Sequence, residues 1–403
     1  MKNPKIRFKG CTEDWEQRKL GELGEIMTGS TPSTSKPEYY SENGIPWVTP
    51  TDIDALTISD TPRKLSEEGI KVGRVVPANT ILCTCIASIG KNALLMVKGS
   101  FNQQINSLTP SAENDSYFLL TESELWSEKM KRMAASGTMQ IVNKTEFSEL
   151  VTMVPSLDEQ KIIGFYFRNI DNLITLHQRK CEETKKLKKY MLQKMFPKDG
   201  ATVPEIRFAG FTEAWEQRKL EDYLEVSREK NKGESYDKED VLSVSGEFGI
   251  VNQIEFQGRS FAGASVANYG VVEVGDVVYT KSPLKSNPYG IIKTNKGKLG
   301  IVSTLYAVYK PRENTDSEFV QIYFELDSRM NSYMHPLVNK GAKNDMKVSD
   351  ENALKGPVIF PKLDEQKAIS QYFRGLDHLI TLHQRKSDEL QNIKKYMLQN
   401  MFV

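Results

Sequence analysis

The sequence repeats itself once, at a spacing of about 200 residues. The first repeated segment is PKIRFKGCTEDWEQRKL at 4–20, which returns as PEIRFAGFTEAWEQRKL at 204–220 with about 13 of 17 residues identical. The second is LDEQKIIGFYFRNIDNLITLHQRKCEETKKLKKYMLQKMF at 157–196, which returns at 363–402 with about 27 of 40 residues identical. A period of this length is the size of a domain and far exceeds a solenoid unit. We therefore expect two similar halves.

The segments inside the two repeats, roughly 24–153 and 224–360, do not align by eye. Each half thus has a constant entry, a variable insert and a constant exit. Such a chain presents two unlike surfaces in one pseudo-symmetric frame, which suits a partner with two related parts or two copies of one partner protein. The formal net charge of +1 excludes a strongly basic nucleic-acid coat but not local basic patches.

The two exit segments are predicted to be long helices. Apolar residues recur at alternating spacings of four and three, which is a heptad stripe with a weakly polar middle. We expect this stripe to form a helix-pair interface through Phe167, Ile170, Ile174, His177, Phe373, Leu376, Ile380 and His383. A second apolar face runs through Tyr166, Leu173, Leu176, Leu187 and Tyr190, and it should pack on a domain or a partner. The paired histidines could serve a metal or proton relay, but a polar notch that sets helix register is favoured. Antiparallel helices are expected to bring both chain ends near the linker.

Both inserts read as mixed α/β with many short strands, which gives an α+β fold class overall. A helix is expected over 121–136 in the first insert and over 317–334 in the second, each followed by a polar loop. No acidic residue lies between Glu68 and Glu113, or between Asp276 and Glu313, although lysines and arginines do. Basic stretches seeded with Tyr, Asn, Gln and Ser suit a phosphate backbone and base edges, whereas a single stretch alone would be read as a solvated face.

Candidate DNA contacts follow from these stretches and loops. In the second half Lys285, Lys340 and Lys343 are expected near phosphates and Asn287, Tyr289 and Asn344 near base edges, with Lys281 and Lys293 in the same basic stretch. In the first half Lys91 is the expected phosphate contact and the amides the expected base readers, while Trp47 is expected in the core. The candidates of the first half are Tyr39, Tyr40, Thr49, Asp52, Ser88, Lys91, Gln103, Gln104, Thr138 and Gln140.

No catalytic motif is complete. Ser286–Tyr289 lacks the second proline of the amino-methyltransferase loop N-P-P-[YF], and no Gly-rich cofactor loop accompanies it. Glu159 and Glu365 begin E-x-K triplets that occur in magnesium nucleases, but both triplets lie at helix starts. Four scattered cysteines indicate neither a disulfide framework nor a metal site, and Cys83 and Cys85 are expected to be buried thiols. No apolar stretch is long enough for a membrane and no signal peptide is visible, so a soluble cytoplasmic protein is expected.

Several motifs resemble those of one family. They are WEQRKLGEL, GIPWVTPTDI, ASIGKNAL, FNQQINSL and PSLDEQKIIGFYF in the first half, and WEQRKLEDYL, VLSVSGEFGI and PKLDEQKAISQYF in the second. In this order they resemble the specificity subunit of type I restriction–modification systems. The resemblance implies two target recognition domains, at 1–156 and 204–362, separated by two long antiparallel helices at 157–196 and 363–403, with a linker at 197–203.

The resemblance also implies a function. Each target recognition domain would read one half of a split double-stranded DNA site, and the helices would set the spacing and bind two modification subunits. Those subunits would hold S-adenosylmethionine and methylate adenine, and restriction subunits that use ATP and magnesium would translocate and cut. The chain itself would be non-catalytic, without a cofactor or metal of its own. The alternatives are a stand-alone methyltransferase or nuclease with its own DNA reader, and a coiled-coil scaffold without a DNA role.

Overall fold

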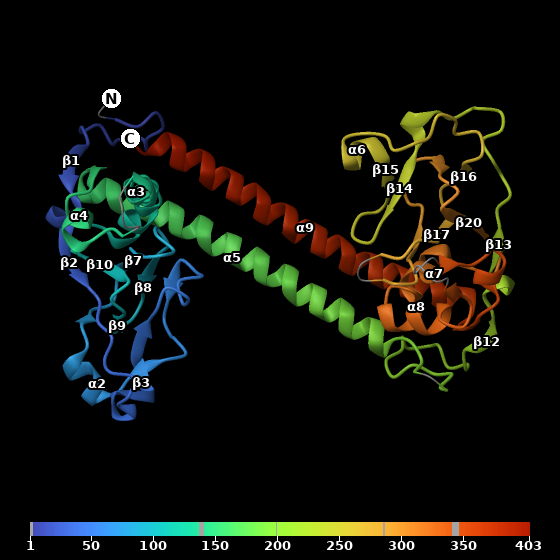
Figure 1. Ribbon diagram of the computed structural model, residues 1–403, viewed down its shortest axis with the longest axis horizontal. Helices are drawn as coiled ribbons and strands as arrows, with labels where there is room; N and C mark the ends of the chain where they lie inside the picture. Colours follow the sequence, from blue (N-terminus) through green and yellow to red (C-terminus); the bar gives the residue numbers. More distant parts are fainter. Residues whose placement is uncertain (1–2, 137–140, 199, 285–286, 341–345) are drawn as a thin grey trace. The chain divides into compact units, whose positions relative to one another are not determined.

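The computed structural model describes residues 3–136, 141–198, 200–284, 287–340 and 346–403. The chain forms two compact units, which are Met1–Gln178 with Arg385–Val403 (unit 1) and Arg179–Gln384 (unit 2). Two long helices, α5 (Leu157–Lys194) and α9 (Leu363–Met401), correspond to the two exit segments (Figure 1). The boundary between the units falls inside both helices, so each unit contains part of α5 and part of α9.

Unit 1 is built on two sheets. One has the strand order β2–β10–β7–β8–β4, with β2 Gly24–Thr28, β4 Thr57–Ile58, β7 Thr80–Thr84, β8 Asn92–Leu95 and β10 Ile105–Pro110. The other has the order β5–β3–β9–β6, with β3 Tyr40–Val48, β5 Lys64–Leu65, β6 Val75–Val76 and β9 Gly99–Phe101. The strand β1 (Glu16–Lys19) pairs antiparallel with β11 (Val151–Val154). The helices are α1 Leu20–Leu23, α2 Glu67–Val72, α3 Ser116–Ser136 and α4 Lys144–Ser148.

The central strand β7 is covered on both faces. Ile81 and Cys83 pack in the core cluster that contains Trp126 of α3, whereas Leu82 between them belongs to a second cluster on the other face. Successive side chains of a strand point to opposite faces, so a strand buried on both sides reads as a continuous apolar run. Cys83 and Cys85 are 0% and 3% exposed, which confirms that they are buried thiols.

Unit 2 repeats the central sheet. Its strand order β13–β20–β17–β18 corresponds to β2–β10–β7–β8, with β13 Leu224–Val226, β17 Val277–Thr280, β18 Ile292–Thr294 and β20 Tyr306–Pro311. The strand β12 (Glu216–Lys219) pairs with β23 (Pro357–Phe360), as β1 pairs with β11. Around this shared frame unit 2 has its own ladders: β14 (Leu242–Ser245) with β15 (Gly249–Asn252), β16 (Gly270–Val272) with β19 (Gly300–Val302), and β21 (Asn339–Lys340) with β22 (Met346–Lys347). The two inserts are therefore variants of one fold.

The helix expected over 317–334 is broken. It forms α7 (Ser317–Tyr323) and α8 (Asp327–Met334), and Leu326 between them is extended with ψ of 112°. The break places the ring of Phe324, which is 4% exposed, 4.9 Å from that of Tyr333 in α8. A short helix, α6 (Gln253–Gln257), follows β15.

The heptad stripe is buried where the helices enter each unit. In unit 1 the ring of Phe167 in α5 lies 5.7 Å from that of Phe402, directly after α9. In unit 2 Phe373 of α9 lies 6.2 Å from Phe196, directly after α5. Both stripe phenylalanines are 0% exposed. Each pair also belongs to the core of the unit that it enters, so the stripe joins the helix ends to the domains.

The chain ends were expected near the linker, but the ends belong to unit 1 and the linker belongs to unit 2. The amide of Ile6 donates to the carbonyl of Asn400 at 2.9 Å, so both ends of the chain meet in unit 1. In unit 2 the amide of Ile206 makes the equivalent bond to the carbonyl of Lys194 at 3.0 Å, across the linker. The hydrogen bond across the linker in unit 2 therefore corresponds to the hydrogen bond between the two ends of the chain in unit 1.

The E-x-K triplets have a structural role. Glu159, which is 2% exposed, accepts two hydrogen bonds of 2.7 Å from the Arg7 guanidinium, and Glu365 accepts from Arg207 at 2.6 and 2.7 Å. These bidentate pairs fasten each entry segment to the start of a long helix. Both carboxylates are fully used in this contact.

Candidate functional site

Three segments of unit 1 that were predicted to contact DNA lie together. The turn between β7 and β8 carries Ser88 and Lys91, and the turn between β9 and β10 carries Gln103 and Gln104. The amide of Cys85 donates to the carbonyl of Gln104 at 2.8 Å, which joins the two turns. The segment after α3 joins them through a bridge between Ile86 and Ile141. One surface of loops is thereby formed at the ends of the central strands.

The β7–β8 turn is held in place by its own residues. The amide of Lys91 donates to the Thr84 hydroxyl at 2.9 Å. Gly90 has a φ of +82°, and a Cβ there would lie 2.8 Å from the Cβ of Ser127 in α3, so only glycine fits. The side chain of Lys91 is exposed and Ser88 is half-buried. A fixed turn with an exposed lysine suits a contact to a DNA phosphate.

The remaining predicted residues of unit 1 differ in their exposure and in the hydrogen bonds that their side chains already make. Gln103 is exposed and accepts a hydrogen bond from the Thr31 hydroxyl, whereas the carbonyl of the Gln104 side chain accepts from Asn102 at 3.1 Å. The Asp52 carboxylate accepts from the amide and hydroxyl of Thr49 at 2.7 and 2.6 Å, so both residues form a local turn. Tyr39 and Tyr40 are half-buried.

The segment before β3 holds Tyr40, one of these two tyrosines. The Tyr40 hydroxyl donates to the carbonyl of Pro32 at 2.7 Å, and burial raises the pKa of this tyrosine. The Trp47 indole donates to the carbonyl of Ser30 at 3.1 Å and its side chain is 3% exposed, which confirms that Trp47 is a core residue.

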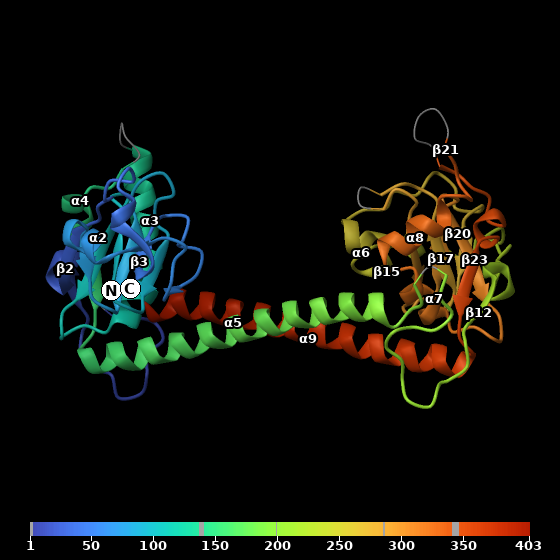
Figure 2. The same ribbon diagram turned by 90° about the horizontal axis from the view of Figure 1, so that it is seen from below.

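In unit 2 the turn between β17 and β18 is anchored to the chain around α8. The Asn287 amide donates to the Asp327 carboxylate at 2.6 Å. Lys281 forms an ion pair with Asp350 at 2.9 Å, shortly after β22. These contacts bring the turn beside the segment that carries β21 and β22. Figure 2 shows β21 and α9 on opposite sides of unit 2.

Two candidates of unit 2 are buried, which contradicts their assignment as DNA contacts. Tyr289 is 6% exposed and its ring packs against His335 with centroids 6.0 Å apart. Lys293 is 7% exposed within β18, and burial lowers its pKa while the nearby Glu325 raises it. A lysine side chain that is buried in this way cannot reach a DNA phosphate. The acid-free stretch therefore mixes surface and core positions.

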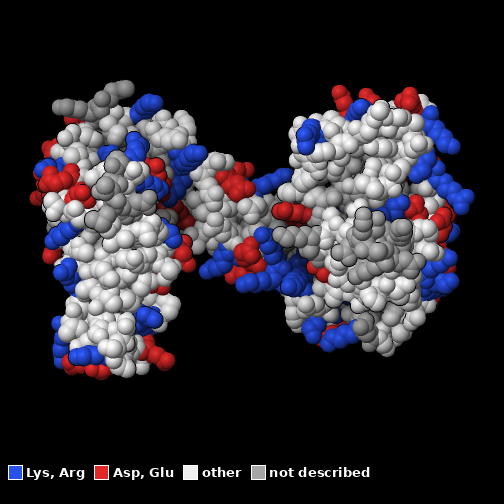
Figure 3. All heavy atoms as spheres, viewed as in Figure 1, with Lys and Arg blue, Asp and Glu red and all other residues white. Residues whose placement is uncertain are grey.

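The other candidates cannot be placed in full. Lys340 lies in β21, but its side chain is outside what the structure describes, and Thr138, Gln140, Lys285, Lys343 and Asn344 lie outside the described residues. Figure 3 shows one face of each unit, on which Lys and Arg lie mainly along the edges and uncharged side chains fill much of the centre. Local basic edges, and not a basic coat, agree with the net charge of +1.

Each long helix also carries a half-buried lysine that the sequence had shown only as a polar member of the stripe. Lys394 of α9 lies 3.0 Å from Asp171 of α5 and 3.0 Å from Glu124 of α3, all in unit 1. Lys188 of α5 lies 2.7 Å from Asp377 and 2.8 Å from Glu325, all in unit 2. Burial lowers the pKa of both lysines, but the two carboxylates outweigh it and raise the pKa overall. In each unit, a lysine and two carboxylates thus join one long helix to the other helix and to the domain.

Within the described ranges, no three His, Cys, Asp or Glu side chains are grouped as metal ligands, and the stripe histidines His177 and His383 are half-buried. None of the described helices is long and apolar enough to cross a membrane.

The duplicated frame is matched by one protein family. The family model of the type I restriction modification DNA specificity domain matches residues 12–186 and again residues 212–392. The chain belongs to this family. Among curated relatives, the MjaIX specificity subunit of Methanocaldococcus jannaschii is 29% identical over 43% of this chain and 42% of its own length. The HindI specificity subunit of Haemophilus influenzae is 29% identical over 40% of this chain and 37% of its own length. The chain therefore matches less than half of these two relatives.

Other members of the family align from end to end. The putative MjaX specificity subunit of M. jannaschii is 26% identical over 96% of this chain and 92% of its own length. A crystal structure of the S subunit of a type I restriction–modification system from M. genitalium superposes with a TM-score of 0.63 at 13% identity, covering 100% of this chain and 99% of that one. This likeness confirms the fold class: two mixed α/β domains with two long antiparallel helices.

Proposed function

We propose that this chain is the DNA sequence-specificity subunit of a type I restriction–modification complex and is not itself an enzyme. The observation that carries the proposal is the repeated sheet order β2–β10–β7–β8 and β13–β20–β17–β18 on a closely similar scaffold, with unlike loops at its ends. One frame with two different loop sets suits a DNA site of two unlike halves. Curated relatives that bear the description of type I specificity subunits support the assignment.

Each unit would read one half-site through its loop surface. In unit 1 the exposed Lys91 would contact a phosphate, and Gln103, Gln104 and Ser88 would face base edges. In unit 2 the anchored turn with Lys281 and Asn287 would border the DNA, together with the polar segment around β21. The two domains would correspond to residues 1–156 and 204–362.

The long helices would space the domains and bind partner subunits. Their second apolar face is largely exposed: Leu173 is 44%, Leu187 44% and Tyr190 50% exposed on α5, and their counterparts Leu379, Ile393 and Tyr396 on α9 are 43%, 46% and 58% exposed. Exposed apolar side chains at equivalent positions suit two copies of one protein partner. These would be methyltransferase subunits that carry S-adenosylmethionine and modify adenine. Restriction subunits using ATP and magnesium would join them for cleavage, in the cytoplasm.

The proposal is tested by co-expression with the partner methyltransferase followed by genome-wide mapping of methyladenine. A single bipartite motif is expected, and absence of any motif would contradict the proposal. Lys91→Ala should weaken binding to all DNA sequences alike and lower the salt dependence of binding by about one unit of slope. Lys98→Ala is the matched control, because Lys98 is an exposed lysine at the opposite end of β8. Gln103→Ala should instead relax one base position of one half-site, at a cost of about 1–3 kcal/mol.

A stand-alone methyltransferase or nuclease remains the competing function. It predicts that the purified chain alone transfers a labelled methyl group to DNA, or cuts DNA in the presence of magnesium. Either activity without a partner would refute the proposed subunit role.

A further inference from the structure

The loop ends of the two central sheets correspond residue by residue. In unit 1 Thr84 of β7 lies opposite Ile105 of β10, and in unit 2 Thr280 of β17 lies opposite Tyr306 of β20. In both units this threonine hydroxyl accepts a hydrogen bond from the amide of the residue just before the next strand, at 2.9 Å in unit 1 and 2.8 Å in unit 2. Because the pairing and the anchor of the turn are the same, a position in one loop set can be matched to a position in the other.

Leu305 occupies in unit 2 the position that Gln104 occupies in unit 1. The amide of Cys85, directly after β7, donates to the carbonyl of Gln104 at 2.8 Å. The amide of Lys281, directly after β17, donates to the carbonyl of Leu305 at 3.0 Å. Both acceptors directly precede the paired strand, β10 or β20. A side chain that can donate and accept hydrogen bonds is thus replaced by one that can do neither.

The side chain of Leu305 is exposed although its backbone is held in place. Leu305 is 62% exposed, and the amide of Tyr306 donates to the carbonyl of Ser303 at 3.0 Å, which closes a turn around it. Lys281, whose amide holds Leu305, forms an ion pair with Asp350 at 2.9 Å, so these two charges neutralise each other. One exposed leucine is ordinary on a protein surface, but this one stands at the position of a predicted base reader.

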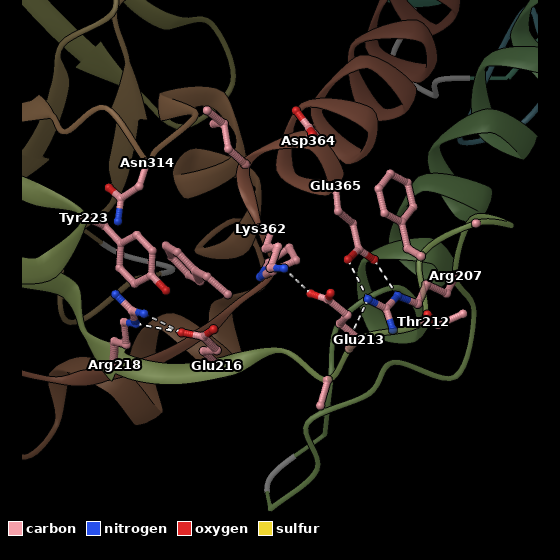
Figure 4. Close-up of a pocket in the computed structure, with 16 residues that line it drawn as sticks. Arg207, Thr212, Glu213, Glu216, Arg218, Tyr223, Asn314, Lys362, Asp364 and Glu365 are labelled. Carbon is pink, nitrogen blue, oxygen red and sulfur yellow. Dashed lines mark hydrogen bonds and ion pairs between the residues drawn. The ribbon is translucent and has the colours of Figure 1, made fainter.

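The opposite end of β20 has a different character. Figure 4 shows the hollow at that end, which has a volume of about 500 Å³ and is lined in part by Tyr223 and Asn314. Three ion pairs line it: Glu213 with Lys362, Glu216 with Arg218, and Glu365 with Arg207. The scaffold end of the sheet is therefore held by ion pairs, whereas the loop end presents the apolar side chain of Leu305.

We infer that Leu305 is a specificity residue of unit 2 that reads the C5-methyl group of a thymine in the major groove. The inference rests on the proposed function and names one feature of the half-site that unit 2 reads. A leucine side chain cannot exchange hydrogen bonds with a base edge, and among the four bases only thymine presents an apolar group in the major groove. At the matched position of unit 1, the Gln104 amide would form hydrogen bonds to a base instead. Unlike chemistry at matched positions suits half-sites of unlike sequence.

The test replaces thymine by uracil, which lacks only the methyl group. The full chain is purified with the methyltransferase subunit, its site is mapped through methyladenine, and each thymine of both half-sites is exchanged singly in a DNA duplex. One exchange should weaken binding by the wild type about fourfold, the effect of about one buried methyl group. The same exchange should have no effect on Leu305→Ser, whose side chain is short and polar. The matched control is Leu299→Ser, because Leu299 is 52% exposed and lies at the other end of β19, and it should keep the fourfold effect.

The outcomes separate this inference from the proposed function. If the wild-type complex recognises no bipartite site, the proposed function fails. If it recognises a site but no uracil exchange weakens binding, thymine reading alone is overturned, and this measurement needs no variant. Persistence of the uracil effect in Leu305→Ser, or its loss in Leu299→Ser as well, would also overturn the inference. So would weaker binding of the methyltransferase subunit by Leu305→Ser with the uracil effect intact, because a protein partner would then cover this surface.

Discussion

Replacing Lys394 by methionine tests the contribution of the ion pairs that join α9, α5 and α3 in unit 1. The Lys394 side chain is 14% exposed, and its ammonium lies 3.0 Å from both Asp171 and Glu124. Asp171 is 9% exposed and would keep a single neutral donor, the Tyr117 hydroxyl at 3.0 Å. Leaving a buried carboxylate without its cation typically costs about 3–5 kcal/mol. Glu124 is 45% exposed, so solvent screening limits its share to about 0–1 kcal/mol.

The expected destabilisation of unit 1 is therefore about 3–5 kcal/mol. For a body of this size it corresponds to a fall in melting temperature of roughly 6–20 °C, at about 2–4 °C per kcal/mol. Tryptophan fluorescence is a suitable probe because Trp15, Trp47 and Trp126 are all buried in unit 1. The control is Lys386→Met on the same helix, whose pair with Glu389 is exposed and contributes less than about 1 kcal/mol.

A second substitution separates charge from packing. Asp171→Asn in the Lys394→Met background removes the unpaired charge and keeps an oxygen that can accept from Tyr117, so it should restore part of the stability. The reasoning is refuted if Lys394→Met costs no more than Lys386→Met, or if Asp171→Asn lowers stability further. The equivalent pair Lys188→Met and Asp377→Asn should behave likewise in unit 2.

Three further predictions concern other parts of the chain. Burial raises the pKa of Glu122 to about 8 in the folded state, against a hydrogen bond from Thr152 that lowers it, so the contribution of Glu122 to stability should be full below about pH 4.5 and be lost as the pH rises through about 8. Glu122→Gln should flatten the pH dependence of urea unfolding in that window, and an unchanged slope would contradict the assignment. Phe167→Ala with Phe373→Ala removes two side chains that are 0% exposed, each at about 3–5 kcal/mol, and should separate the helices from the domains; assembly with unchanged stability would show that the stripe is misplaced. A permuted chain that joins residue 403 to residue 1 and opens within the linker should still bind DNA with its half-sites exchanged along the chain, because Ile6 bonds to Asn400 as Ile206 bonds to Lys194; an unfolded permutant would count against this equivalence.

The repeat and the periodicity were enough to predict the frame. The heptad stripe marks Phe167 and Phe373, which are both fully buried, and the apolar run around Cys83 marks a strand covered on both faces. The continuous pattern over 317–334 hid the break between α7 and α8, because local periodicity does not report the packing of Phe324 on Tyr333. Secondary structure was thus predictable where the local apolar pattern reports burial, and not where a tertiary contact interrupts a helix.

The candidate contacts were harder to predict because charge patterning along a chain does not report burial. Lys293 belongs to a basic stretch yet lies inside a strand near Glu325, which is 32 residues away in sequence. Lys188 and Lys394 were visible only as polar members of an apolar stripe, since their acidic partners come from distant segments. A lysine at the same stripe position in both repeats was the signal that could have pointed to them.

The division of the long helices between the two units has a consequence for synthesis on the ribosome. Unit 2 is a single uninterrupted stretch, Arg179–Gln384, so it can close as soon as that stretch has emerged. Unit 1 needs Met401 and Phe402 to fill its core against Trp15 and Phe118, and these residues are added about 250 residues after its last sheet strand, β11. Until residue 402 has been added, Trp15 and Phe118 of nascent unit 1 therefore lack the ring of Phe402 as a packing partner. Removal of the last three residues should damage the amino-terminal domain and spare the one made after it.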